Sequence, residues 1–451
     1  MQFHVRVVLV WMLTPSLFCR NYLMTGSHPT SHAKPASPYI GDVMASLVLF
    51  IIAVPLSLGI AMASGTPAAS AIVAIVVGAL VVGSLAGAPL VVSGPAAGLS
   101  ALVLQFVTLH GFQGLMVITV IAGVLQIVLG TLRLGRTIQL IPKTVIEGVL
   151  SAIGFIIVLG QLHILAGKSI PGAPLKSLLE LPNTFAAAIG HISASNPAFM
   201  ALAVGLFAIS LQVIWRNWIP AKLKFIPAAL PAIIIATLVS WDLEIPKVVL
   251  QNLGSYTTES LATFAAAISG SQWFHLIPAA IGLALVASAE SLITAKATDI
   301  LAQKHHVKSG LAINRELFAQ GVGNLVTGAL GGLPVSGVMV RSAANVESGG
   351  RTRLATMLHG VWVIGFILFL PGIVAKMPSA ALASVLILIG IKLINAKHML
   401  QAVQSNLREA YLWPGTALAI MTTDLLTGLV IGVGLAVADN IYKTLHSKIR
   451  A

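Results

Sequence analysis

Two short stretches far apart in the chain decide the fold: LVVSGPAAGL at 90–99 and LPVSGVMVRS at 333–342. Each places Val-Ser-Gly at the start of an apolar segment that is broken by Gly or Pro. A straight helix needs about 20 apolar residues to cross a bilayer, and both segments are shorter. A broken apolar segment of this kind predicts a helix that begins inside the membrane.

The composition around these stretches is that of a membrane protein. Of the 451 residues, 57% are hydrophobic and only 9% are charged, whereas soluble domains carry about 25% charged residues. Apolar runs recur from about Asp42 to Lys443 and predict an all-α polytopic protein with about 14 transmembrane segments. The first seven run at roughly 42–63, 66–86, 91–108, 114–132, 138–165, 196–215 and 225–241. The second seven run at roughly 273–295, 311–330, 334–346, 354–370, 378–395, 410–424 and 425–443.

The two quoted stretches hold the third place in each group of seven. An odd number of segments per group gives the two groups opposite orientations, which predicts an inverted repeat with repeat one at 42–241 and repeat two at 273–443. We expect residues 1–38 to be a poorly ordered cytoplasmic leader or the product of a misplaced start codon. The transporter domain is expected over 39–445, and residues 446–451 form a short tail.

The basic residues set the expected orientation. With the amino terminus in the cytoplasm, eighteen Lys and Arg residues outside the leader fall on the cytoplasmic side, against Lys168, Lys176, Lys247 and Lys376 on the other side. Basic residues concentrate in cytoplasmic loops of membrane proteins. We therefore expect a multi-pass protein of the cell membrane with both termini inside. The net charge of +13 follows from this topology and does not indicate nucleic-acid binding.

Two helix starts that face each other inside the membrane would make an anion site. Their free backbone N–H groups and positive dipole ends favour negative charge. Ser93 and Ser336 are expected as N-caps, and Pro95 suits the first helical turn. The alternative is a kink beside a glycine packing face. The predicted substrate-binding residues are Ser93, Gly94, Pro95, Ala96, Ala97, Ser336, Gly337, Val338, Met339, Val340 and Arg341.

Among the charged residues within predicted spans, Glu290 and Arg341 are the functional candidates, because an ionisable group inside the membrane is a functional hypothesis. Glu290 has Thr294 one helical turn away, and together they are candidates for a Na⁺ site. Glu290 is also a candidate proton carrier or a structural partner of a basic group. Arg341 would add a positive charge beside the anion, unless it forms a salt bridge with Glu290 or lies at the cytoplasmic mouth. We expect no cofactor beyond Na⁺ or H⁺ as coupling ion.

The chain resembles the sulfate permease (SulP) family of anion transporters. The motifs that carry the resemblance are VSGPAAGL at 92–99, NRELFAQG at 314–321 followed by Gly323-Asn324, and LPVSG at 333–337 continuing to RSAAN at 341–345; Glu290 also stands where the family has an acidic residue. The resemblance implies fourteen helices in a seven-plus-seven inverted repeat, with core and gate subdomains. It also implies that the two half-helices hold the anion and that the core moves against the gate.

Within the family, the run AVPLSLGIA at 53–61 is similar to a bacterial branch often associated with carbonic anhydrase. Sulfate carriers tend to have Gln where Leu56 stands and Ser where Val338 and Val340 stand, so the resemblance favours bicarbonate over sulfate. Family members usually carry a cytoplasmic STAS domain after the last helix, and only the tail 446–451 follows it here. A homodimer and a carbonic anhydrase are the expected partners, besides the anion and the lipid bilayer.

Other functions stay open at this stage. A nucleobase–proton symporter shares the architecture by resemblance, but its site would need carboxylates on two core helices, and Glu290 is the only one that the sequence places clearly. An uncoupled anion channel is a further alternative. The apolar segments contain no Gly-x-Ser-x-Gly, His-Glu-x-x-His or paired Asp motif, so we expect no enzyme activity.

Overall fold

The computed structural model describes residues 38–135, 143–171, 174–190, 192–193, 195–219, 228–269, 271–307, 310–394, 407–423 and 425–450. Over these ranges every regular element is helical except for two three-residue strands. The predicted leader lies outside the described residues except for Pro38, which begins the first helix. The predicted start of the fifth segment, at 138–142, also lies outside them.

The first half of the chain begins with α2 (Pro38–Ala63) and α3 (Ala68–Val77). A π-helical turn, η2 (Gly78–Val82), joins α3 to α4 (Gly83–Leu85), and strand β1 (Ser93–Pro95) follows. Next comes α5 (Ala97–Thr131), which is two helices, because Gly111 has a φ of 69° and breaks it. The remaining helices are α7 (Lys143–Leu165), α8 (Pro174–Ile189), α9 (Pro197–Trp218), α10 (Ala229–Val239) and α11 (Leu253–Ser269).

The second half repeats the pattern of a short strand ahead of a half-helix. A 3-10 helix, η4 (Ser271–Leu276), leads into α12 (Ile277–Lys304) and α13 (Ile313–Ala329). Strand β2 (Val335–Gly337) precedes the short α14 (Met339–Glu347). The chain continues through α15 (Arg353–Phe369), α16 (Pro371–Val374), α17 (Ser379–Ile394), α19 (Leu407–Thr422) and α20 (Leu425–Arg450).

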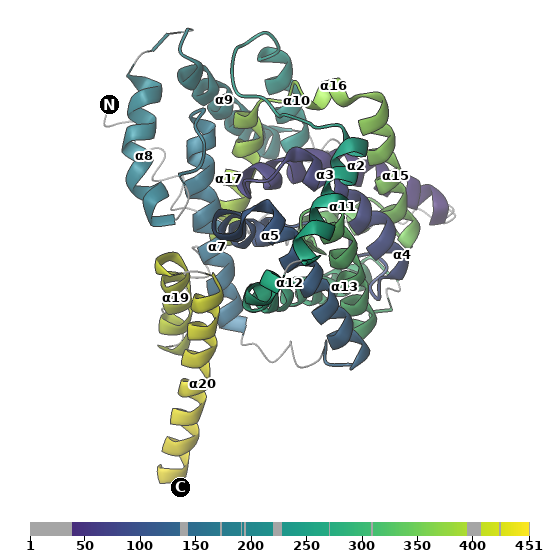
Figure 1. Ribbon diagram of the computed structural model, residues 1–451, viewed down its shortest axis with the longest axis vertical. Helices are drawn as coiled ribbons and strands as arrows, with labels where there is room; N and C mark the ends of the chain where they lie inside the picture. Colours follow the sequence, from purple (N-terminus) through teal and green to yellow (C-terminus); the bar gives the residue numbers. More distant parts are fainter. Residues whose placement is uncertain are drawn as a thin grey trace.

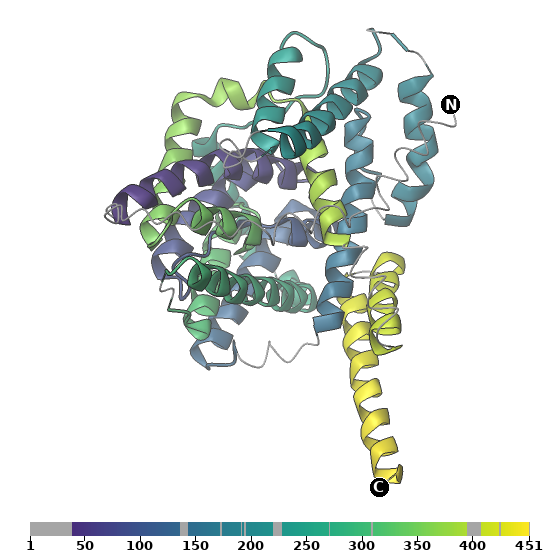
Figure 2. The ribbon, with the colours of Figure 1, turned by 180° about the vertical axis from the view of Figure 1, so that it is seen from behind.

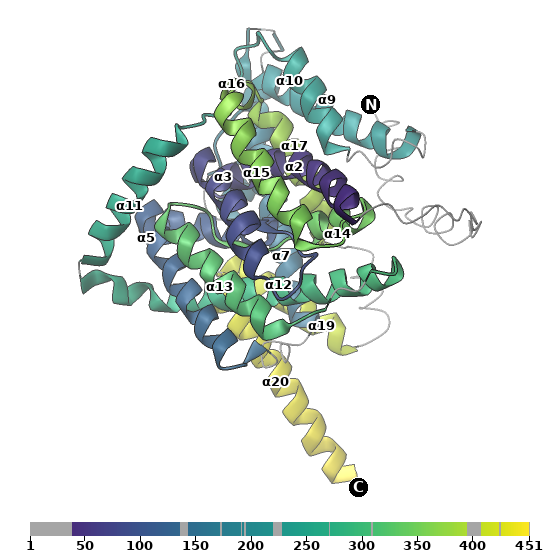
Figure 3. The same cartoon turned by 90° about the vertical axis from the view of Figure 1, so that its right-hand side faces the viewer.

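The helices gather in two groups that lie side by side. In Figure 1 one group contains α2, α3, α5, α12, α13 and α15, and the other contains α7, α8, α9 and α17. Figure 2 shows the same division from behind, with α20 extending away from both groups. Figure 3 shows α15 beside α2, and α11 along the outer edge of the first group. A buried apolar cluster that includes Leu99 of α5, Val149 of α7 and Leu386 of α17 joins the two groups.

The helices are apolar enough for a multi-pass membrane protein. Over the described residues, six helices have the length and hydropathy to cross a bilayer: Tyr39–Ala63, Ala68–Leu85, Ala97–Thr131, Glu147–Leu165, Pro197–Trp218 and Trp273–Lys304. Four shorter apolar helices, Ala229–Val239, Arg353–Phe369, Ser379–Lys392 and Thr427–Asp439, accompany them. The count of fourteen spans and the seven-plus-seven inverted repeat remain predictions.

Three features of the fold differ from the sequence analysis. The helices α8 and α11 lie in stretches that we expected to be loops, because neither carries a long apolar run. Helix α12 continues to Lys304, nine residues past the predicted end at 295, so Lys296 and Lys304 are helical and not in a loop.

The predicted helix caps are wrong. Ser93 and Pro95 lie in β1, and the N-cap of α5 is Ala96, which makes no side-chain cap. Ser336 lies in β2, and the N-cap of α14 is Val338, also without a side-chain cap. The two serines were expected to satisfy backbone N–H groups of their own helices. Their hydroxyls instead bond to side chains of other helices, as the next section describes.

Candidate functional site

The two stretches quoted from the sequence meet in space. Strands β1 and β2 pair antiparallel, with Ser93 opposite Gly337 and Gly94 opposite Ser336. The pairing continues past the strands, because the Val338 N–H donates to the Val92 carbonyl at 2.9 Å. Each strand leads directly into a helix, and because the strands are antiparallel the amino ends of α5 and α14 lie at opposite ends of this two-stranded ribbon, each pointing toward it.

Helix α13 supports both strands through three buried side chains spaced four residues apart. The Glu316 carboxylate accepts from the N–H groups of Gly87 and Ala88, each at 2.9 Å, and from Gln320 Nε2 at 2.8 Å. Gln320 Nε2 also donates to Ser93 Oγ at 2.7 Å. Residues at i, i+4 and i+8 share one helix face, which is why one helix can reach both strands.

Asn324, the third of these side chains, binds the backbone of β2. Its Oδ1 accepts from the Val335 N–H at 2.7 Å, and its Nδ2 donates to the Val335 carbonyl at 3.0 Å. Nδ2 also donates to Gln126 Oε1 at 2.8 Å, and Gln126 Nε2 donates to Ser288 Oγ at 3.0 Å. These bonds connect α13, α5 and α12 around the two strands.

Helix α12 brings Glu290 and Thr294 against β2. The Glu290 carboxylate accepts from Ser336 Oγ at 2.9 Å. Thr294 Oγ1 donates to the Gly337 carbonyl at 3.0 Å, and Ser291 Oγ accepts from the Gly337 N–H at 3.0 Å. Glu290 is partly buried, and Thr294 is 4% exposed. The predicted pair therefore lies against the same strand. The Glu290 carboxylate, the Thr294 hydroxyl and the Gly337 carbonyl are the oxygen atoms that it brings to β2.

Arg341 lies in the first turn of α14 and is fully buried. Its Nη2 donates to Ser57 Oγ at 2.5 Å and to the Ala53 carbonyl at 3.4 Å, both on α2. Nε and Nη1 are buried and have no hydrogen-bond partner among the described residues. The bonds of Arg341 thus go to α2, and the structure does not show the alternative of a salt bridge with Glu290.

Two glycines of the first stretch face these two charges. A Cβ added to Gly94 would lie 2.5 Å from Arg341 Nη1, and one added to Gly98 would lie 2.5 Å from Glu290 Oε1. Only a residue without a side chain allows this approach. Gly94 in β1 and Gly98 in α5 therefore let this stretch of backbone approach both charges closely.

The other predicted site residues surround the ribbon. Ala96 and Val338 are buried at the starts of the two helices, and Ala97 is half-buried. Met339 and Val340 are 41% and 55% exposed. The strand residues are enclosed, and in the first turn of α14 Met339 and Val340 are accessible whereas Arg341 is buried. The structure brings all the predicted residues into one region, and whether they bind an anion stays a prediction.

Sequence analysis missed part of this region. Gln320, Asn324 and Ser57 were quoted only within motifs, with no role assigned. Glu316 is a second buried carboxylate, on α13, and the successive four-residue steps from Glu316 to Gln320 and from Gln320 to Asn324 were the signal that pointed to a shared face. Its two oxygens accept three hydrogen bonds. The part of the chain that the structure describes contains no cluster of three or more His, Cys, Asp or Glu side chains.

A broken helix pair that encloses buried charges, within a bundle of membrane-length helices, defines a polytopic membrane transport protein. The family is established by sequence. The sulfate permease family matches residues 39–416, so the chain belongs to that family of membrane anion transporters.

Relatives and solved structures agree with this assignment. The chain is 29% identical over 415 residues to the bicarbonate transporter BicA of Picosynechococcus, covering 88% of this chain and 69% of that one. It is 23% identical to the putative sulfate transporter YbaR of Bacillus subtilis, over 90% of this chain and 78% of that one. The transmembrane domain of a cyanobacterial BicA superposes with a TM-score of 0.71 at 24% identity, covering 89% and 97% of the two chains. The structure of SLC26A9 superposes with a TM-score of 0.74 at 17% identity, covering 90% and 66%.

Proposed function

We propose that this chain carries a small inorganic anion, bicarbonate in the first place and sulfate in the second, by coupled alternating access. One observation supports the anion site most strongly: the fully buried Arg341 guanidinium lies against Gly94 of the paired strands that lead into the two half-helices, and two of its nitrogens have no hydrogen-bond partner among the described residues. A buried charge without a partner is unfavourable, and an oxyanion supplies the acceptors that Arg341 Nε and Nη1 lack. A hydrogen bond from either nitrogen to an anion oxygen would be charge-assisted, and such bonds are stronger than neutral ones.

The preference for bicarbonate has two supports. The first is the name of the relatives with 29% and 28% identity, both called bicarbonate transporter BicA. The second is the apolar character of Val338 and Val340 at the start of α14, where the resemblance led us to expect serine in sulfate carriers. An apolar wall offers fewer donors to a doubly charged anion.

For coupling, we propose that Glu290 takes up Na⁺ or H⁺. The carboxylate, the Thr294 hydroxyl and the Gly337 carbonyl are oxygen donors of the kind that hard cations prefer. A cation at Glu290 would lie across the ribbon from the anion at Arg341 and would offset its charge. A proton on Glu290 would remove the same negative charge, so both ions remain candidates.

Membrane placement and partners complete the proposal. We expect both termini on the cytoplasmic side, a core that contains the two half-helices, and a gate formed by the group around α7 and α17. A homodimer and a carbonic anhydrase partner also remain expectations. The carbonic anhydrase would supply or consume bicarbonate at the cytoplasmic face.

Uptake into proteoliposomes tests the proposal. Labelled bicarbonate and labelled sulfate are each supplied with an inward Na⁺ gradient, with a proton gradient, and with neither. We expect bicarbonate uptake that the Na⁺ gradient stimulates. Sulfate uptake driven by a proton gradient alone would replace this proposal with a sulfate–proton symporter. Uptake of neither anion would reject it.

A further inference from the structure

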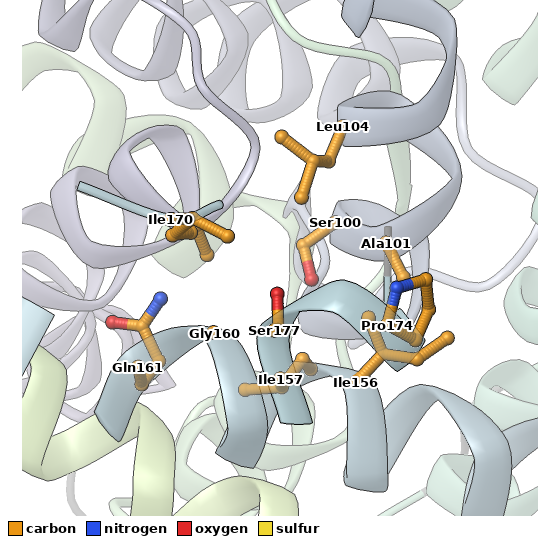
Figure 4. A pocket seen from close by; sticks show the side chains of 11 residues that line it. Ser100, Ala101, Leu104, Ile156, Ile157, Gly160, Gln161, Ile170, Pro174 and Ser177 are labelled. Atoms are coloured by element: carbon orange, nitrogen blue, oxygen red, sulfur yellow. The ribbon is translucent and has the colours of Figure 1, made fainter. Parts of the chain in front are cut away.

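A small cavity lies where the two helix groups meet, away from the ribbon. Its walls come from the half-helix part of α5, from the last turns of α7 and from the start of α8 (Figure 4). Its volume is about 10 Å³, roughly the room that one water molecule needs. Three polar side chains line it, Ser100, Gln161 and Ser177, and the remaining walls are apolar.

Gln161 makes this cavity unusual. The residue is 1% exposed, and both its Nε2 and its Oε1 are buried without a hydrogen-bond partner among the described residues. Burying an unpaired amide is unfavourable, and leucine would fill similar space without that cost. A second buried glutamine, Gln212 of α9, shows the usual arrangement, since its Nε2 donates to Ser384 Oγ at 2.8 Å.

The outer wall of the cavity is held in place by one histidine. His163 Nδ1 lies 2.7 Å from Thr184 Oγ1, and Nε2 lies 2.9 Å from the Ser177 carbonyl. These bonds connect α8 to α7, because His163 lies two residues after Gln161 near the end of α7. Figure 4 shows the hydroxyls of Ser100 and Ser177 pointing toward one another across the cavity. Helix α8 therefore forms one wall of the cavity and is bonded to α7.

The half-helix of α5 separates the cavity from the proposed coupling residue Glu290. Ser100 is two residues from Gly98, which faces Glu290, and it lies on the other side of the same half-helix, toward α7. The lining contains donors in its amide and hydroxyls but no carboxylate. The lining therefore offers hydrogen-bond donors that suit an oxyanion, and it offers no charged ligand to a cation.

We propose that Gln161, with Ser100 and Ser177, forms a second hydrogen-bonding station for the transported oxyanion, between the ribbon and the membrane face on the α8 side. The proposal rests on the anion-transport function proposed above. In this conformation the cavity has room for about one water, so the anion enters it when α5 and α7 separate. Gln161 Nε2 then donates to an anion oxygen.

Gln161→Leu tests the station in sealed vesicles of both orientations, with labelled bicarbonate and labelled sulfate. We expect KM to rise about five- to tenfold, the loss of one hydrogen bond, for uptake from the α8 face only. The melting temperature should be unchanged or higher, because an unpaired amide is removed. Gln212→Leu is the matched control, and it should lower the melting temperature without changing KM on either face.

The outcomes separate the station from the transport function. If the wild type takes up the anion and Gln161→Leu has an unchanged KM on both faces, the station alone is overturned. The cavity then holds only a structural water. A lower melting temperature with an unchanged KM also overturns it and assigns Gln161 to packing. Absence of wild-type uptake overturns both proposals together.

A second measurement tests the station without a Gln161 substitution, for the case in which Gln161→Leu does not fold. Ser177→Cys is introduced after Cys19, the only native cysteine, is replaced by serine. Ser177 is 2% exposed, so a membrane-impermeant thiol reagent should react only when the cavity opens. Saturating bicarbonate or sulfate should slow the reaction severalfold. Labelling that is equally fast with and without both anions overturns the station.

Discussion

Replacing Gly98 by alanine tests whether the position of Glu290 controls coupling. The added Cβ would lie 2.5 Å from Glu290 Oε1 and 3.0 Å from its carboxyl carbon, whereas ordinary contacts begin near 3.4 Å. The carboxylate must therefore move by about 0.9 Å, the difference between 3.4 and 2.5 Å. A shift of that size away from α5 breaks the bond from Ser336 Oγ, which is 2.9 Å long. Hydrogen bonds to charged groups contribute about 1.5–3 kcal/mol, or roughly 10- to 100-fold in an affinity.

The assay is labelled-anion uptake measured against the concentration of the coupling cation. We expect Gly98→Ala to raise the half-saturating cation concentration at least tenfold while the protein remains folded, since a flexible side chain absorbs the overlap. Gly365→Ala on α15 is the control, because a Cβ there meets nothing within 4 Å. A cation dependence equal to that of the wild type in folded Gly98→Ala would refute the reasoning and remove Glu290 from the coupling site.

Four further substitutions test the remaining contacts. Gly94→Val places a side chain on Arg341 Nη1, where even a Cβ would lie at 2.5 Å, and should abolish uptake; retained transport would remove the first stretch from the site. Arg341→Ala should raise the anion KM at least tenfold, and an unchanged concentration dependence would place Arg341 outside the site. Glu290→Gln keeps an oxygen that accepts from Ser336 but loses the charge, so uptake should no longer follow the cation gradient; normal gradient-driven uptake would contradict this. Asn324→Ala leaves both backbone groups of Val335 unpaired, a loss of about 3 kcal/mol, and a melting temperature equal to that of the wild type would show that β2 is held by other contacts.

The sequence predicted the region of the site because its signals are local. Val-Ser-Gly at the start of two apolar segments marks a break wherever the segments lie, and the structure pairs these breaks as β1 and β2. Glu290 and Arg341 are conspicuous because charges are rare in apolar runs. The membrane class and the family are confirmed, whereas the roles assigned to these residues remain predictions.

What the sequence did not predict depends on distant partners. The Ser93 hydroxyl was expected to cap its own helix, but Gln320 lies 227 positions away and donates to it. Helix α8 carries only a short apolar face, and His163 of α7 bonds to it through Thr184 and the Ser177 carbonyl. Neither contact has a periodic or compositional signal, so neither was visible before the fold.

The hydrogen bonds around the ribbon determine where the protein can move. Buried directional bonds from α13 and α12 hold Ser93, Val335 and Gly337, so α5, α12, α13 and α14 must move together. The contact between α5 and α7 includes apolar side chains such as Val103, Ile153 and Ile157 of the buried cluster. Apolar contacts are non-directional and can slide without leaving a polar group unpaired. We therefore expect alternating access to open between α5 and α7, which is where the cavity of Gln161 lies.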